Sequence, residues 1–280
     1  MPVRPALPET GLRFFRLIVF LSCLLLCWQT LPAHAGTACD DAPPDARKIM
    51  QAMNFALRVQ EALNDSGAEL AIIARAGQDL SQYHLVYSHL GVIRKMPDGR
   101  WFVLHELNHC GTSGSGLFEE GLGNFFLDDM FRFRSLILIP PQPLQQAMLA
   151  RISDGTALAL HEPQYNMLSY AFSTRYQNSN QWGLELLATA ADPRVHKRSE
   201  AQRWLRAMQY KPDVIDVPAM TRLGARMFRA NIRFDDHPFG DRMAGKIATV
   251  TVESVQQFMW EHALTENTLE IDGGMPERKQ

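Results

Sequence analysis

Several features that mark particular protein classes are scarce in this chain. Its formal net charge is only −2 over 280 residues, with no cluster of Lys and Arg. Because phosphate binding depends on clustered basic side chains, nucleic acid is not an expected partner. No repeat with a period of about 20–50 residues is present, which excludes solenoids and propellers. With 46% hydrophobic and 21% charged residues, the composition is that of a globular protein and excludes a disordered tail or a low-complexity array.

Long hydrophobic runs are also lacking, except near the start of the chain. A basic beginning leads into an apolar run, Leu17 to Trp28, that only Ser22 interrupts, and the small residues Ala33 and Ala35 follow. The run is shorter than the ~20 apolar residues of a bilayer span. We therefore expect residues 1–35 to be a signal peptide, cleaved near Ala35/Gly36. The mature chain would then be periplasmic or secreted, without a transmembrane segment. An uncleaved membrane anchor is the alternative.

Cysteine is limited to 4 residues, and two of them fall inside the predicted signal peptide. Cys39 and Cys110 remain, and two thiols in an oxidising compartment favour a single disulfide. Such a bridge would close a long loop and stabilise the fold by roughly 4 kcal/mol in the chain-entropy model. The alternative is that Cys110 is a free nucleophile.

The order of apolar patterns predicts an α+β fold, with a mainly antiparallel sheet packed with helices, because strands and helices alternate without a regular βαβ rhythm. No linker divides residues 36–280, so we expect one globular domain, with a C-terminal extension at about 191–264 and a frayed polar tail at 265–280. Residues 111–116 are rich in Gly and Ser and predict a loop. Strands are expected over 69–75, 86–94, 100–107, 134–139 and 246–252, and helices over 45–64, 144–152, 178–190, 199–208 and 254–262.

One group of polar residues combines two predicted strands and a predicted helix start. His89 lies in the segment Tyr87-Ser88-His89-Leu90-Gly91-Val92, His105 lies on the returning strand, and Ser179 follows Asn178 where a helix begins. This order resembles the circularly permuted branch of the NlpC-type papain-like superfamily, which includes the lecithin:retinol acyltransferase-like proteins. Over its whole length the chain also resembles a family of secreted bacterial proteins catalogued as domain of unknown function 2145.

The papain-like resemblance implies a catalytic core over about residues 69–190 and an amide or ester hydrolase. Ser179 would be the nucleophile, His89 the base and His105 the group that orients it. The chain departs from the superfamily at Ser179, where a Cys is usual, and a Ser hydroxyl does not ionise as a thiol does. The alternatives are a non-catalytic protein that binds a small molecule, peptide or lipid of the cell envelope, and a plain N-cap role for Ser179. Ligand or oxyanion contacts are expected from Asn178, Asn180 and Gln181.

A second motif, His105-Glu106-Leu107-Asn108-His109, matches H-E-x-x-H. On a helix, its two His side chains would bind zinc and Glu106 would activate water. The residues before it predict a strand, in which His105 and His109 would lie ~13 Å apart. We therefore expect no cofactor, and a zinc metallopeptidase is a further alternative.

A third group, Asp235-Asp236-His237, precedes Pro238. Two carboxylates and an imidazole could serve as accessory acid–base or metal-binding groups. Asp and Pro also favour turns, and neighbouring side chains in an extended run point to opposite sides. A turn is the interpretation that the residue types favour.

Overall fold

A six-stranded antiparallel sheet organises the computed structural model, which describes residues 45–128, 130–228 and 230–274. The strand order is β4-β3-β2-β1-β5-β8, and every neighbouring pair is antiparallel. The strands are β1 (Leu70–Ala76), β2 (His89–Lys95), β3 (Trp101–Asn108), β4 (Ser115–Gly121), β5 (Arg132–Ile139) and β8 (Asn267–Gly274). The expected α+β fold with a mainly antiparallel sheet is confirmed.

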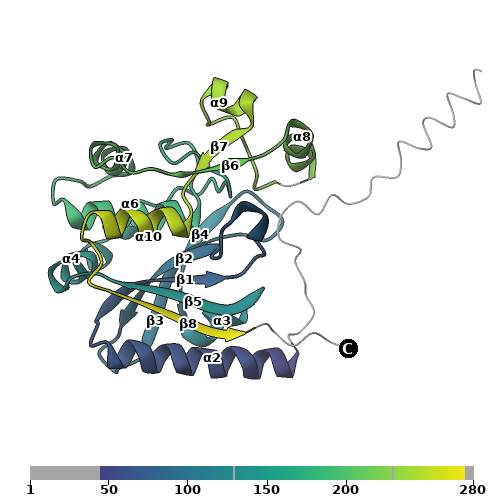
Figure 1. The fold of residues 1–280 in the computed structure, drawn as a ribbon. Coiled ribbons are helices and arrows are strands. Elements are labelled where there is room, and N and C mark those ends of the chain that lie inside the picture. The colour runs from purple at the N-terminus through teal and green to yellow at the C-terminus, as the bar shows by residue number, and fades with distance from the viewer. Residues whose placement is uncertain (1–44, 129, 229, 275–280) are drawn as a thin grey trace, which may run out of the picture. The chain divides into compact units, whose positions relative to one another are not determined.

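Helices cover both faces of this sheet (Figure 1). On one face lie α2 (Ala46–Asp65) and α3 (Leu122–Leu127), and on the other lie α4 (Gln142–Ser153), α6 (Ser179–Ala191) and α10 (Val252–Glu261). The short α5 (Thr156–Ala159) and α7 (Arg198–Ala207) belong to the α6 side. Two apolar cores result, one on each face of the sheet.

Strand β1 shows how the sequence produces two cores. Leu70, Ile72 and Ala74 pack into the core on the α6 side, whereas Ala71 and Ile73 pack into the core on the α2 side. Successive side chains on a strand point to opposite faces, so a strand buried on both faces needs an uninterrupted apolar run. The same alternation decides which polar side chains can meet.

A smaller sheet lies in the C-terminal part, where β6 (Asp213–Asp216) pairs with β7 (Lys246–Thr249). Between these strands the chain forms α8 (Ala219–Phe228) and α9 (Phe239–Ala244). A 3-10 turn, η1 (Ser81–Tyr83), precedes β2.

The structure corrects the predicted polar tail at 265–280, because residues 267–274 form strand β8 on the edge of the sheet. Leu269 and Ile271 pack against the core on the α2 side, and ion pairs join Arg134 to Glu270 and Arg132 to Asp272 across β5 and β8. An edge strand with an open face carries polar residues, which is why its composition suggested a tail. The predicted loop at 111–116 ends earlier than expected, since Ser115 and Gly116 already belong to β4.

The predicted signal peptide, its cleavage site and Cys39 lie outside the described residues. Within the described ranges, no helix is both long and apolar enough to cross a membrane. The disulfide between Cys39 and Cys110 stays a prediction.

Candidate functional site

His89 and His105 lie side by side on the face of the sheet that α3 covers. Nε2 of His89 is 2.8 Å from Nδ1 of His105, so the two rings share one hydrogen bond. The ring of Phe125, which is fully buried on α3, packs 6.0 Å from His89 and 5.4 Å from His105. The structure therefore brings these two predicted site residues together.

Charged residues flank the histidine pair on both sides. Arg75 is the cross-strand partner of His89, and Oε2 of Glu120 lies 3.4 Å from Nε2 of His105. Burial lowers the pKa of His89 well below its usual value, and the charge of Arg75 and the neighbouring His105 lower it further. His89 is thus a neutral base at pH 7.

Ser179 lies on the other side of the sheet. Leu90, the neighbour of His89 on β2, points toward α6, where a Cβ added to Gly183 would be 2.3 Å from its Cδ2. Because side chains alternate along a strand, His89 points away from α6 and from Ser179 at its N-terminus. The structure does not bring the proposed nucleophile Ser179 and its proposed base His89 together.

A different serine and histidine meet on the α6 side. The Oγ of Ser115, at the start of β4, lies 3.0 Å from Nε2 of His161 and 2.7 Å from Oε1 of Glu106. Glu106 follows His105 on β3 and therefore points to the opposite face, where it is fully buried. A hydroxyl, an imidazole and a carboxyl thus lie in one hydrogen-bonded chain.

Tyr165 connects this chain to the start of α6. The backbone N–H of Tyr165 donates to Ser113 O at 2.7 Å, and that of Ser115 donates to Pro163 O at 3.0 Å, so the two segments run alongside each other. Tyr165 also pairs in a single β-bridge with Gln177, two residues before α6. Burial raises the pKa of Tyr165, with a further contribution from the nearby Glu106.

The electrostatics of this cluster favour proton transfer near neutral pH. Burial raises the pKa of Glu106 to about 8, although the hydrogen bond from Ser115 and the charge of Arg198 oppose the shift. Burial also lowers the pKa of His161, which is therefore neutral at pH 7. A carboxyl that titrates near neutral pH beside a hydroxyl and an imidazole is a combination found in catalytic sites.

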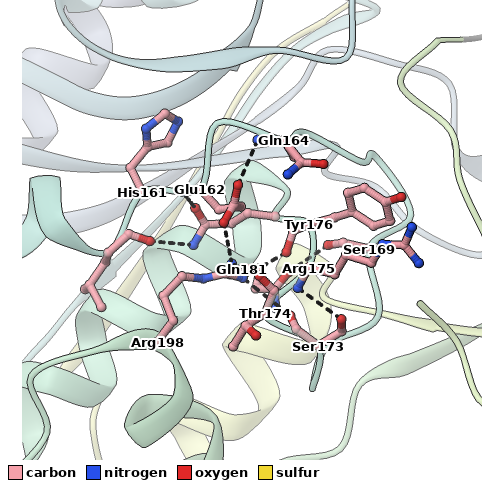
Figure 2. Close-up of polar contacts among 12 residues, drawn as sticks. His161, Glu162, Gln164, Ser169, Ser173, Thr174, Arg175, Tyr176, Gln181 and Arg198 are labelled. Atoms are coloured by element: carbon pink, nitrogen blue, oxygen red, sulfur yellow. Dashed lines mark hydrogen bonds and ion pairs between the residues drawn. The ribbon is translucent and has the colours of Figure 1, made fainter. Parts of the chain in front are cut away.

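The polar residues around Ser179 serve the fold itself. Oδ1 of Asn178 accepts from the backbone N–H of Gln181 and caps α6, while its amide donates to Met167 O. Asn180 donates to Val250 O at 3.2 Å. Gln181 accepts from Ser169 and donates to backbone carbonyls of the segment before α6 (Figure 2). These bonds secure the start of α6 and leave few groups of Asn178 and Gln181 for a ligand.

A buried ion pair joins α7 to α6 next to the segment that carries His161. Nε of Arg198 on α7 is 2.8 Å from Oε2 of Glu185 on α6, and Arg198 also donates to the carbonyl oxygens of Thr174 and Tyr176 (Figure 2). Burial raises the pKa of Glu185, and Arg198 counteracts the rise. The pair fixes the irregular segment that precedes α6.

Asp235, Asp236 and His237 form a turn that holds the same segment. Tyr176 donates to Asp235, Tyr170 N donates to Asp236 at 2.7 Å, and Nε2 of His237 is 2.8 Å from Leu168 O. Each of the three residues contacts the segment at a different point. The turn interpretation accounts for these contacts.

The His105-Glu106-x-x-His109 motif lies on a strand and the turn after it, as its flanking residues predict. His105 and Glu106 consequently point to opposite faces of the sheet, which separates the groups that a zinc peptidase would need on one side of a helix. Among the residues that the structure describes, no group of three or more His, Cys, Asp or Glu side chains could hold a metal ion.

Sequence reasoning missed Ser115, His161 and Tyr165. Ser115 and His161 are 46 residues apart, and His161 lies in an irregular segment with no partner visible in the sequence. Their meeting depends on the pairing of Gly114 with Gln164, a single isolated bridge. No periodic pattern signals such a contact.

The fold and site define an α+β protein with a serine–histidine pair at one edge of its sheet. The model of the family described as "Uncharacterized protein conserved in bacteria (DUF2145)" matches residues 62–259, and the chain belongs to this family. No curated protein and no solved structure shows a significant match. The papain-like resemblance of the core stays a prediction.

Proposed function

We propose that the protein is a hydrolase of amide or ester bonds with Ser115 as nucleophile and His161 as base. One observation carries the proposal: Oγ of Ser115 lies 3.0 Å from Nε2 of His161, within the reach that proton transfer requires. A hydroxyl is a weak nucleophile on its own, and a neutral imidazole at this distance is the group that activates it.

In the proposed reaction, Ser115 Oγ attacks the carbonyl carbon of the substrate while its proton passes to His161. Protonated His161 then gives that proton to the leaving amine or alcohol, and an acyl-serine forms. Water attacks the acyl group with His161 again as base, which releases the acid and restores the serine.

Glu106 sets the pH range of this site. With a pKa of about 8, its carboxyl is mostly protonated at pH 7, so His161 is the available base. At higher pH, ionised Glu106 competes for the Ser115 proton at 2.7 Å. The predicted signal peptide adds a location to the proposal: the substrate would be a peptide or an acylated lipid of the cell envelope.

A fluorophosphonate probe tests the proposal directly, because it forms a stable bond only with an activated serine. We expect mass spectrometry to find the label on Ser115. The label should disappear in Ser115→Ala and form far more slowly in His161→Ala. Ser179→Ala is the matched control, since Ser179 is also buried but forms no hydrogen bond with a histidine among the described residues, and it should leave Ser115 labelled.

Two results would contradict the proposal. Label on Ser179 in place of Ser115 would return the nucleophile to the start of α6. Absence of any serine label, together with no turnover on ester and peptide substrates, would favour the non-catalytic binding protein.

A further inference from the structure

We infer that Gln177 is a positioning residue for His161, an inference that rests on the proposed function. His161 lies between α5 and α6, where no helix or strand fixes its backbone. The side-chain amide of Gln177 binds the residues on both sides of it. Its Nε2 donates to Leu160 O at 3.1 Å, and its Oε1 accepts from Glu162 N at 2.8 Å.

The two bonds form a clamp around one residue. A single amide that holds the carbonyl before His161 and the N–H after it limits rotation of the backbone at that position. The direction in which the imidazole leaves the chain is therefore limited as well. A base must be held within a fraction of an ångström of its partner, since a displacement of about 1 Å can lower a rate by ~100-fold.

Buried charged and polar side chains hold the Gln177 amide in place. Nε2 of Gln177 also donates to Oε2 of Glu185 at 2.6 Å, and Glu185 is held by Arg198 and by Gln202 at 2.8 Å each. Gln177 and Glu185 are both fully buried. Arg198 also lies 4.0 Å from Glu162, in the segment that carries His161 (Figure 2).

The chemistry of the clamp requires both halves of an amide. Leu160 offers an acceptor and Glu162 offers a donor, so a carboxylate at residue 177 would lose the bond to Leu160 and would meet the charge of Glu185. A shorter amide, as in Gln177→Asn, keeps the chemistry but loses one methylene of reach. Gln177→Asn should therefore not hold His161 in position, although its side chain is polar.

The test is a double-mutant cycle read by the rate of Ser115 labelling with the fluorophosphonate probe. Gln177→Ala should slow labelling by between about tenfold and 100-fold. His161→Ala should slow it at least as much, and the variant with both changes should be no slower than His161→Ala alone. A residue that acts only on overall stability would slow His161→Ala further. Gln164→Ala is the control and should label at the wild-type rate, because the Gln164 side chain is exposed and its bridge to Gly114 uses backbone bonds alone.

Additive effects in the cycle, or wild-type labelling of Gln177→Ala, would overturn the inference while leaving the proposed function in place. Failure of the wild-type protein to label at Ser115 would overturn the proposed function first. Gln177→Asn and Glu185→Gln provide the same cycle if Gln177→Ala does not fold, because each keeps a polar group at its position. Both should show the same loss of additivity with His161→Ala, and Glu185→Gln, which acts one bond further away, should slow labelling less.

Discussion

Replacing Arg198 by Met tests how much the fold depends on the buried ion pair. Arg198 lies 2.8 Å from Glu185 and donates at 2.9 Å to the carbonyl oxygens of Thr174 and Tyr176. Met fills a similar volume but leaves the fully buried Glu185 without its cation. Removing one partner of a buried pair typically costs about 3–5 kcal/mol, because the remaining charge is uncompensated. We expect a loss of stability in this range at pH 7, measured by urea denaturation.

The pH dependence of this loss separates the charge effect from lost packing. Burial already raises the pKa of Glu185 above 4.5, and loss of Arg198 raises it further. A carboxyl with a raised folded pKa contributes stability that is full below its unfolded pKa and is lost as pH rises through the folded pKa. The deficit of Arg198→Met should therefore be smaller at pH 5 than at pH 8. Adding Glu185→Gln should recover most of the loss at pH 8.

Arg194→Met is the control, because the side chain of Arg194, which pairs with Asp192, is 87% exposed. Its removal should change stability little. A loss below ~1 kcal/mol for Arg198→Met would refute the magnitude derived from the buried pair. An equal deficit at pH 5 and pH 8 would refute the electrostatic cause.

Three further changes have defined outcomes. Between pH 4.5 and about 8, folded Glu106 holds a proton that the unfolded chain releases. Stability should therefore fall with rising pH by up to ~1.4 kcal/mol per unit, and Glu106→Gln should flatten the slope in urea denaturation. Gly183→Ala should destabilise the protein by about 1–3 kcal/mol in thermal unfolding, since its Cβ would lie 2.3 Å from Leu90 Cδ2; a more stable variant would contradict this. Truncation after Glu266 removes β8 and leaves the outer edge of β5 unpaired, so light scattering should detect aggregation, and a soluble product with unchanged melting would argue against it.

Local patterns predicted the central elements of the fold. The helices expected over 45–64 and 178–190 match α2 and α6, and the strands expected over 86–94 and 100–107 match β2 and β3, which are joined by a turn where Gly99 has a φ of +84°. The edge strands β4 and β8 escaped because their residues are polar and pair with only one neighbour. Such strands are identified by the strand beside them, which lies far away in the sequence.

The candidate site was harder to predict, for a geometric reason. The sequence indicates that His89, His105 and Ser179 are polar residues in ordered elements, but not which face of the sheet each one occupies. That assignment depends on which helices pack against Leu90 on one face and on the packing of α3, with Phe125, against the other face. The position of His161 depends on an irregular segment that is held by residues far away in the sequence, Gln177 and the turn at Asp235. The face that each side chain occupies and the position of His161 are both set by packing between elements.

Ser179→Cys tests the placement of Ser179 against the papain-like resemblance. If His89 activated residue 179, a thiol there would ionise easily and would be alkylated fast, and His89→Ala would abolish the gain. The structure predicts another result. Residue 179 is only 3% exposed, and His89 lies across the sheet, so alkylation by iodoacetamide should be slow.

The N-terminus of α6 can still lower the thiol pKa by itself, which makes dependence on His89 the decisive readout. Peptide mapping by mass spectrometry should give the same alkylation rate at residue 179 with and without His89→Ala. A rate that falls with His89→Ala would instead place the reactive centre with His89, and the proposal that Ser115 and His161 carry the chemistry would be contradicted.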